Sequence, residues 1–417
     1  MVAYVDIDKR KFEKKNQTEA RREEILFRFL TAGESHGPAL SAIIEGLPAN
    51  LTIDFAEVNR QLKRRQGGYG RGARQQIETD TVEITSGVRF GVTMGGPITL
   101  NIRNRDHEQN WRDRMAVMPV ENPIPPITQP RPGHADFAGM LKYRYDDLRP
   151  ILERSSARNT TALVAVGAIC RLLLLQIGIE IISHVVTIGG VQAHFDASVS
   201  YSDIAARAEE SPVRSADPVA EARMIAAIDV CMQEGTRDTL GGVFEVVALG
   251  CPPGLGSFVH WDRKLDARLA LAMMSIQAMK GVEIGMGFGV GLVPGSKVHD
   301  EIYYDAQDGF TRGTNNAGGI EGGMTNGQPI VVRVAMKPLS TLPTPLASVD
   351  MKTHEPVRAH FERSDVCAVP AAGTIGEAMM AIVLTEAALE KFGGDSLEEF
   401  KRNAQAYFTD IRSRGYK

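Results

Sequence analysis

A serine and a histidine stand between two glycines at residues 33–37, which read Gly-Glu-Ser-His-Gly. They follow the apolar run 25–30, which is typical of a strand, and polar side chains at such a sharp turn commonly face a pocket. The spacing Gly-x-Ser-x-Gly also fits the nucleophile elbow of α/β-hydrolases. The segment therefore allows two chemistries, nucleophilic attack by Ser35 or proton transfer by His36.

The densest charged segment lies between residues 60 and 77, where no acidic residue occurs. Its cations are Arg60, Lys63, Arg64, Arg65, Arg71 and Arg74. Cations suit the C-terminal end of a helix, so a solvated helix end is the simplest interpretation. The glycines within 67–72, however, would let a backbone approach a ligand closely. Because guanidinium groups bind carboxylates and phosphates in bidentate geometry, we favour a site for a small anion.

Three further segments place arginine beside serine, histidine or aspartate. In residues 131–136 (Arg-Pro-Gly-His-Ala-Asp), rigid flanks hold His134 as a candidate acid or base, although a lone loop histidine is more often a surface residue. Residues 154–158 (Arg-Ser-Ser-Ala-Arg) precede an apolar helix and suit either an anion or simple capping by a serine. In residues 363–365 (Arg-Ser-Asp), we expect Asp365 either to pair with an arginine or to work near a reacting centre.

The elements that position these residues alternate between strand-like and helix-like segments, which predicts a mixed α/β fold. The predicted strands are 25–31, 41–45, 82–90, 98–103, 179–192, 242–249, 283–288 and 330–336. The predicted helices are 55–65, capped by Thr52 or Asp54, 157–177, 218–234, capped by Asp217, 265–279 and 375–392. No repeat or linker separates them, so we expect one large domain at 26–417 after a mobile N-terminal extension at 1–25.

Two long segments are predicted to be irregular, and long irregular segments in a compact domain are usually functional or disordered. Residues 104–135 hold six prolines between Pro119 and Pro132, and residues 312–328 are rich in glycine. The part at 104–130 is the first candidate for a lid over a site.

The composition narrows the class of protein. Among 417 residues, 43% are hydrophobic and the net charge is −4, which allows a large core and argues against a general nucleic-acid binder. Four scattered cysteines without Cys-x-x-Cys argue against structural zinc or disulfides and fit a reducing cytoplasm. No metal-binding or P-loop motif occurs, and the glycines at 285–291 do not match a dinucleotide fingerprint. Because no secretory or membrane-spanning segment is apparent, we expect a soluble cytoplasmic protein.

Taken together and in this order, these segments resemble chorismate synthase. The matching stretches are residues 29–37, 64–66, 86–89, 131–136, 153–158, 275–285, 318–324, 337–341 and 363–365. They extend from near residue 27 to near residue 390 and are highly specific as a set. Residues 1–25 have no counterpart in the usual family pattern.

The resemblance implies a reaction, a fold and an assembly. The family converts 5-enolpyruvylshikimate 3-phosphate to chorismate and phosphate by anti-1,4-elimination, using reduced FMN without net redox change. This is the last common step of the shikimate pathway to aromatic amino acids. The implied fold is a β-α-β sandwich of the α/β (α+β) class, and the implied assembly is a homotetramer.

The resemblance also implies roles for single residues. His36 would protonate or stabilise the departing phosphate, His134 would favour the anionic reduced flavin from beside its pyrimidine ring, and Asp365 would tune the flavin nitrogen that accepts the substrate proton. The implied substrate contacts are Ser35, Arg65, Arg71, Arg74, Arg131 and Arg158. The implied FMN contacts are Arg154, Ser155, Ser156, Gln277, Ala278, Gly322, Lys337, Pro338, Leu339, Ser340, Thr341 and Arg363. Two carboxylates and a phosphate on the substrate fit an arginine-dense pocket.

Two other functions have weaker support. A nucleophile elbow needs a helix after the serine, but Pro38 and the strand-like 41–45 follow instead. A nucleic-acid-binding or scaffold protein would use aromatic residues interleaved with the basic ones, and this pattern is absent. The sequence leaves open whether the chain reduces its own flavin with NADPH, which Arg65 and Arg71 could touch, or depends on an external flavin reductase.

Overall fold

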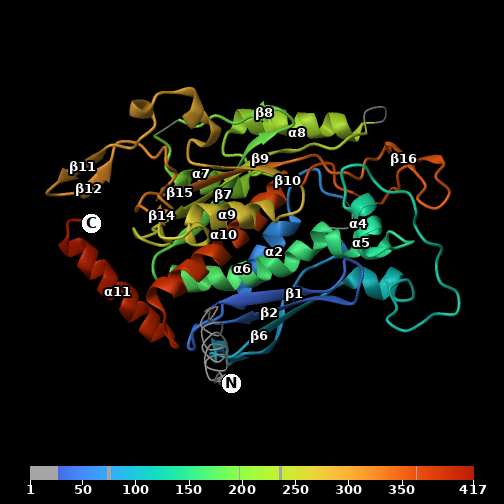
Figure 1. Ribbon diagram of the computed structural model, residues 1–417, viewed down its shortest axis with the longest axis horizontal. Coiled ribbons are helices and arrows are strands. Elements are labelled where there is room, and N and C mark those ends of the chain that lie inside the picture. Colours follow the sequence, from blue (N-terminus) through green and yellow to red (C-terminus); the bar gives the residue numbers. More distant parts are fainter. Residues whose placement is uncertain (1–26, 73–76, 197, 234–236, 363) are drawn as a thin grey trace, which may run out of the picture.

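Two β-sheets enclose a layer of helices in the computed structural model (Figure 1). The structure describes residues 27–72, 77–196, 198–233, 237–362 and 364–417. The predicted β-α-β sandwich is therefore confirmed. The expected extension at 1–25 lies outside the described residues, as do Arg74 and Arg363. The division into that extension and one domain stays a prediction.

The smaller sheet carries the serine and histidine of the opening segment on a hairpin. Its order is β1 (Arg28–Ala32), β2 (Ala39–Glu45), β6 (Ile98–Arg103) and β3 (Glu83–Ser86), with antiparallel neighbours. The chain turns sharply between β1 and β2, where Gly33 has a φ of +109° and a Cβ atom would lie 2.4 Å from the carbonyl oxygen of Ala39. A hairpin turn is not the strand–turn–helix geometry of a nucleophile elbow, so the serine-hydrolase alternative loses its structural basis.

The larger sheet is antiparallel and runs in the order β10 (Met279–Ile284), β15 (Ile330–Met336), β9 (Gly242–Leu249), β7 (Glu180–Ile188) and β8 (Val191–Gln192). The strands predicted at 98–103, 242–249 and 330–336 are confirmed with the same bounds, as β6, β9 and β15. The strand predicted at 283–288 is wrong in position. Strand β10 starts earlier because Met279 pairs with Met336, and it ends where Gly285, at φ +58°, turns the chain.

The helical layer consists of α2 (Phe55–Gln66), α6 (Thr160–Leu175), α9 (Leu265–Met274) and α10 (Val369–Phe392). Asp54 and Asp217 cap α2 and α8 (Pro218–Met232), as predicted, because their carboxylates accept from backbone N–H groups of the first turn. The helix predicted at 265–279 is too long, since α9 ends at Met274 and the chain then enters β10. The helix predicted at 157–177 begins as a 3₁₀ turn, η2 (Ala157–Asn159).

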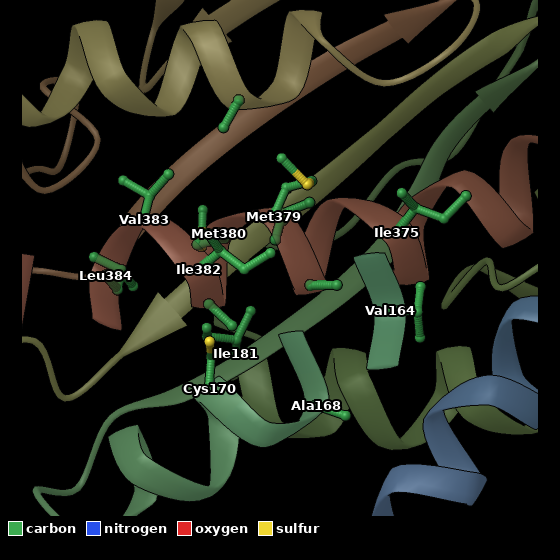
Figure 2. Close-up of a cluster of buried hydrophobic side chains, with 14 of the residues drawn as sticks. Val164, Ala168, Cys170, Ile181, Ile375, Met379, Met380, Ile382, Val383 and Leu384 are labelled. Carbon is green, nitrogen blue, oxygen red and sulfur yellow. The ribbon is translucent and has the colours of Figure 1, made fainter. Parts of the chain in front are cut away.

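Helices α6 and α10 pack against each other along the middle of the sandwich. Figure 2 shows α6, with Val164 and Ala168, lying beside α10, with Ile375 and Met379. A Cβ atom on Gly167 would lie 2.4 Å from the Cβ atom of Ala378, so the glycine permits this close approach. Helix α6 also contacts the smaller sheet and α10 contacts the larger one, so the pair joins both sheets.

Several elements were missed by the sequence patterns. They are η1 (His107–Trp111), α4 (Asp136–Tyr143), α5 (Arg149–Ser155), α7 (Tyr201–Glu210), α11 (Leu397–Ser413), and the short paired strands β5 (Val92–Thr93), β11 (Ile302–Asp305), β12 (Gly309–Arg312), β13 (Ile320–Glu321), β14 (Met324–Thr325), β16 (Ala347–Val349) and β17 (Pro356–Arg358). The strand predicted at 82–90 is divided into β3 and β4 (Val88–Arg89). The π-helical turn η1 interrupts the segment 104–135, which was predicted to be wholly irregular. Helices α4 and α5 lie with β16 at one end of the molecule (Figure 1).

Among the residues that the structure describes, two helical segments are long and apolar enough to cross a membrane by composition. They are Arg149–Leu175 and Val369–Phe392, and 83% and 94% of their apolar windows are buried within the fold. Such burial is typical of the core helices of a globular protein.

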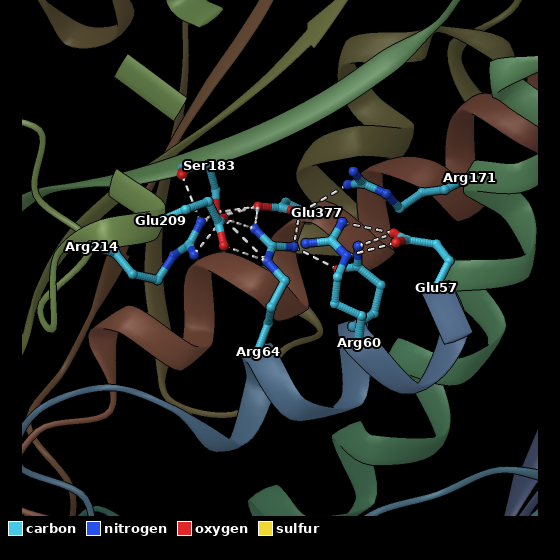
Figure 3. A network of polar contacts seen from close by, with 9 residues as sticks. Glu57, Arg60, Arg64, Arg171, Ser183, Glu209, Arg214 and Glu377 are labelled. Carbon is cyan, nitrogen blue, oxygen red and sulfur yellow. Dashed lines mark hydrogen bonds and ion pairs between the residues drawn. The ribbon is translucent and has the colours of Figure 1, made fainter. Parts of the chain in front are cut away.

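A buried carboxylate, Glu377 of α10, ties four parts of the sandwich together (Figure 3). Its oxygens accept hydrogen bonds from Arg64 of α2 at 2.6 and 2.8 Å, from Arg171 of α6 at 2.9 Å and from Ser183 of β7 at 2.6 Å. Arg214 lies 3.4 Å away. Burial opposes the charge of Glu377, but the guanidinium groups prevail and hold its pKa at about 2.

Glu377→Ala is expected to lower the free energy of unfolding by about 3–5 kcal/mol, because it leaves buried guanidinium groups without their counter-charge. The folded pKa lies below the ordinary value of 4.5, so this stabilisation is fully present above pH 4.5 and is lost as the pH falls towards 2. Urea unfolding at pH 7 and at lower pH measures both effects. Arg60→Ala, at an exposed pair with Glu57, is the control and should change stability by less than about 0.5 kcal/mol. Equal losses in the two variants would contradict this account.

Candidate active site

A cavity of about 620 Å³ opens where α6 and α10 begin. Its walls come from the β1–β2 turn, the segment after α2, the loop before α4, the α5–α6 junction, the α9–β10 turn, and the segments after β15 and before α10. Segments far apart in the sequence therefore meet at one place.

Most of the predicted site residues line this cavity. All three candidates for proton transfer, His36, His134 and Asp365, are among them. The others are Ser35, Arg65, Arg71, Arg131, Ser155, Ser156, Arg158, Gln277, Ala278, Lys337, Leu339, Ser340 and Thr341.

Three predicted contacts do not line the cavity in this chain. The guanidinium of Arg154 instead donates to the carbonyl oxygens of Thr31, at 3.0 Å, and Gly33, at 3.2 Å, and so fastens the end of β1. Gly322 lies between β13 and β14, and Pro338 follows β15 without a place in the wall. Their flavin contacts stay predictions, as do those of Arg74 and Arg363, which the structure does not describe.

His36 is held from three sides. Its ring Nδ1 lies 2.8 Å from one oxygen of Glu153, and its backbone N–H donates to the other oxygen at 2.7 Å. The ring stacks on Trp111 with centroids 3.9 Å apart, and His107 Nδ1 lies 2.8 Å from the His36 carbonyl oxygen. Among the residues that the structure describes, no hydrogen bond occupies Nε2.

His134 belongs to a second fixed group. Its Nδ1 pairs with Asp136, which also accepts from Arg131 Nε at 2.9 Å. Burial opposes the charge of Asp136, but hydrogen bonds from His134 and Arg131 prevail and hold its pKa well below the usual range. Arg131 Nη1 donates to Thr341 at 2.7 Å, and Ser340 donates to the Gly133 carbonyl at 2.8 Å. The segment after β15 thus fixes the loop that carries His134.

The cavity concentrates positive charge. Arg65 is buried and donates to Thr160 at 2.9 Å, while Arg158 holds Asp80 through two bonds of 2.6 and 2.7 Å. Burial lowers the pKa of Arg65 to about 9; the Asp80 carboxylate opposes this, and the nearby charges of Arg158 and Arg71 add to it. An anion bound here would relieve this repulsion.

Asp365 pairs with Arg71, at 3.1 Å, and accepts from the Gly72 N–H at 2.6 Å. One of the two expectations for this carboxylate, pairing with an arginine, is therefore confirmed. Other arginines of the cationic segment 60–74 also pair with carboxylates. Arg64 joins the Glu377 network, and Arg60 pairs with Glu57 at the surface.

Three buried polar atoms of the cavity wall have no hydrogen-bond partner within the described chain. They are Arg71 Nε, Gln277 Oε1 and Arg158 Nη2, the last of which lies 3.7 Å from a carboxylate oxygen of Glu78. Buried donors and acceptors are normally paired, so unpaired ones in a cavity wall indicate a polar ligand. Two guanidinium donors select an anion, and the first turns of α6 and α10 add a positive potential.

Sequence reasoning missed several residues around the cavity. Glu78 and Glu362 line it, and Asp80, Glu153 and Trp111 contact residues that do. Glu153 directly precedes the Arg-Ser-Ser-Ala-Arg segment, which was the one available signal. Within the described chain, no three histidine, cysteine or acidic side chains form a group that could hold a metal ion.

Two fixed histidines, a carboxylate and several buried guanidinium groups around one cavity define an enzyme site for a small molecule with several negative charges. The family model for chorismate synthase matches residues 27–389. The chorismate synthase of Syntrophotalea carbinolica is 59% identical over 384 residues, which cover 91% of this chain and 97% of that protein. That of Streptococcus sanguinis is 56% identical over 377 residues, with 90% and 96% covered.

A solved structure agrees with these relatives. A crystal structure of chorismate synthase matches with a TM-score of 0.75 and 46% sequence identity, covering 93% of this chain and 98% of the other. The chain belongs to the chorismate synthase family. It is a lyase of aromatic biosynthesis that eliminates phosphate from 5-enolpyruvylshikimate 3-phosphate to form chorismate, with a requirement for reduced flavin.

Arg71→Lys is expected to raise the KM for the substrate about 10- to 100-fold, because lysine keeps the charge but loses the planar fork and the Nε donor. A hydrogen bond to a charged group contributes about 1.5–3 kcal/mol, and each 1.4 kcal/mol is tenfold. Steady-state kinetics with varied substrate measures the change. Arg60→Lys, in the same cationic run but at the surface, is the control, and a wild-type KM for Arg71→Lys would disprove the assignment.

Proposed function

We propose that this cavity holds reduced FMN and 5-enolpyruvylshikimate 3-phosphate together, and that His36, His134 and Asp365 handle the protons. The observation that carries the proposal is the meeting of two carboxylate-paired histidines with unpaired guanidinium atoms in one cavity. Family membership supports a reduced flavin in general, and FMN is the specific form that we propose.

The residues present fit a flavin. A flat ring with polar edges needs an apolar wall with a few polar atoms, and the α9–β10 turn supplies both. Ile276 and Met279 are apolar there, and the buried Oε1 of Gln277 lacks a partner among the described residues. The proposed contacts are Ser155, Ser156, Gln277, Ala278 and the segment from Lys337 to Thr341. Burial, with the nearby charges of Lys280 and Arg131, lowers the pKa of Lys337. The phosphate or the anionic ring of a bound flavin would stabilise the charged form of this lysine.

The substrate would take the remaining cations. Ser35 accepts from Ser156 Oγ at 3.0 Å and lies beside His36 in the same turn. Arg65, Arg71 and Arg158 would bind the anionic groups of the substrate, and Arg131 would contribute from beside His134. Bound anions would replace the missing partners of the guanidinium atoms.

Each proton-handling residue has a distinct task in this proposal. The bound flavin supplies transient electron density that helps to break the carbon–oxygen bond. His36 donates a proton or a hydrogen bond to the departing phosphate and lowers the cost of its new charge. His134 supplies positive charge beside the flavin, and Asp365 acts next to the position that receives the substrate proton.

The finer features of the protein also remain proposals. We infer a cytoplasmic homotetramer from the family pattern. Exposed apolar side chains on β1 and β2, Leu30 and Ile43, are consistent with a covered sheet face in such an assembly. The flavin is reduced either by this chain itself, with NADPH, or by an external flavin reductase.

His36→Gln and His134→Gln should each lower kcat by about 10²–10⁴-fold, the usual contribution of a positioned acid or base. Both should keep the wild-type melting temperature and flavin binding, because glutamine preserves much of the shape. His260→Gln, at an exposed pair with Asp262, is the matched control and should keep full activity. Wild-type turnover in either active-site variant would contradict the role proposed for that histidine.

The most direct test of the function is an anaerobic assay with chemically reduced FMN. Chorismate and phosphate should form in equal amounts without net oxidation of the flavin, and FMN should bind more tightly when substrate is present. Reduced riboflavin, which lacks the phosphate, tests the choice of FMN, and NADPH with oxidised FMN tests self-reduction. A lack of chorismate with reduced FMN would defeat the proposal.

A further inference from the structure

The contact between Glu153 and His36 joins the end of α5 to the β1–β2 turn. One carboxylate oxygen faces the ring Nδ1 at 2.8 Å, and the other accepts the backbone N–H of the same residue at 2.7 Å. The Ser35 N–H donates to the Glu153 backbone carbonyl at 3.2 Å. Glu153 is 1% exposed and binds the turn through both its side chain and its backbone carbonyl.

The neighbours of the pair fix the ring further. Trp111 stacks on the imidazole with an interplanar angle of 24°, which closes one face of the ring. The Cζ atom of Arg149 lies 5.0 Å from the centroid of the Trp111 ring, and its Nη1 donates to Glu153 at 3.3 Å and to Glu362 at 2.7 Å.

Several charged and titratable groups of the described chain lie around His36. Glu153 and Arg149 come from α5, and His107 comes from η1. Beyond them, Arg114 lies over Trp111, and Glu362 pairs with Arg149 and His360. Glu153 is the acid that contacts the ring itself.

The hydrogen-bonding capacity of a carboxylate decides what this contact does. An ionised carboxylate only accepts, so the Nδ1 that faces it carries a proton. The other ring atom, Nε2, has no hydrogen bond from the described chain, and His36 lines the cavity. A carboxylate on one ring nitrogen favours the charged imidazolium, which presents an N–H at the other nitrogen.

We propose that Glu153 is a positioning residue, which holds His36 protonated at Nδ1 and aims Nε2–H at the departing phosphate. The inference rests on the proposed role of His36 as the proton or hydrogen-bond donor. Glu153 does not touch the reacting atoms; it acts through the ring, as the acid of a Ser-His-Asp triad acts through its histidine.

A purely structural role for Glu153 makes a different prediction. It would fasten α5 to the β1–β2 turn, and its loss would lower stability without changing the pH dependence of the reaction. The protein offers a matched comparison, because His184 and Glu245 form a second histidine–glutamate pair at 3.0 Å, away from the cavity wall.

Glu153→Gln and Glu153→Asp test the inference by steady-state kinetics over a pH range. The glutamine variant should lose about 10²-fold in kcat with little change in KM, and its alkaline limb should move to lower pH because the charge favouring the imidazolium is gone. Glu153→Asp keeps the charge but shortens the reach, so kcat should fall while the alkaline limb stays in place. Glu245→Gln is the control and should match the wild type in both readouts.

The double variant His36→Gln with Glu153→Gln separates this inference from the proposed function. If Glu153 acts through His36, the double variant is no slower than His36→Gln alone. Wild-type turnover of His36→Gln would reject the role of His36 itself. A slow His36→Gln together with a fully active Glu153→Gln, or with losses that multiply, would overturn the role of Glu153 only. Should Glu153→Gln fail to fold, an unchanged kcat in Glu153→Asp would overturn it equally.

Discussion

The close packing of α6 against α10 is the constraint on which the rest of the structure depends. Gly167 lets the two helices approach so closely that no side chain fits between it and Ala378. One helix then covers the smaller sheet and the other the larger, and both begin at the cavity. The segments that enter these helices, 155–160 and 364–372, are thereby brought face to face. The position of the cavity is thus a consequence of where two core helices start.

Buried arginines are neutralised by carboxylates in the Glu377 network but only partly in the cavity wall. Arg64 and Arg65 are neighbours on α2, and because successive helix residues point about 100° apart, they enter different surroundings. Burial opposes the charge of both, but Glu377 and Glu209 prevail at Arg64 and raise its pKa. At Arg65 burial prevails and lowers the pKa. The scaffold arginine is satisfied within the protein, whereas the cavity holds a surplus of positive charge that suits an anionic substrate.

The sequence predicted the fold where a local pattern determines the structure. Apolar β-strands such as β9 and β15 were predicted with their bounds, and Asp54 was one of two candidates for the helix cap that it forms. The patterns failed where partners distant in the chain decide, as at Met279, which joins a strand through Met336. Short helices such as α5 carry too few turns to show a periodicity.

In the site, too, local patterns identified single residues but not their distant partners. Both histidines and Asp365 were found from their flanking residues, but Glu153 lies 117 positions from His36, and no local pattern links them. Trp111 was missed because its segment shows no regular pattern in the sequence, and its ring is placed by contacts with residues distant in the chain, His36 and Arg149. Arg154 shows a contact that the sequence did not predict, since its guanidinium fastens the end of β1, while its contact with the flavin stays a prediction. The identity of site residues could thus be predicted better than the interactions that hold them.

Arg71 Nε, from the segment after α2, and Arg158 Nη2, from the turn before α6, are expected to hold the substrate beside His36. A crystal structure of the protein with FMN and 5-enolpyruvylshikimate 3-phosphate measures this directly. The account predicts the phosphate within hydrogen-bond distance of His36 Nε2, and the anionic groups of the substrate on Arg71 Nε and Arg158 Nη2. Substrate bound outside the cavity, or inside it with those two nitrogen atoms still unpaired, would contradict the account.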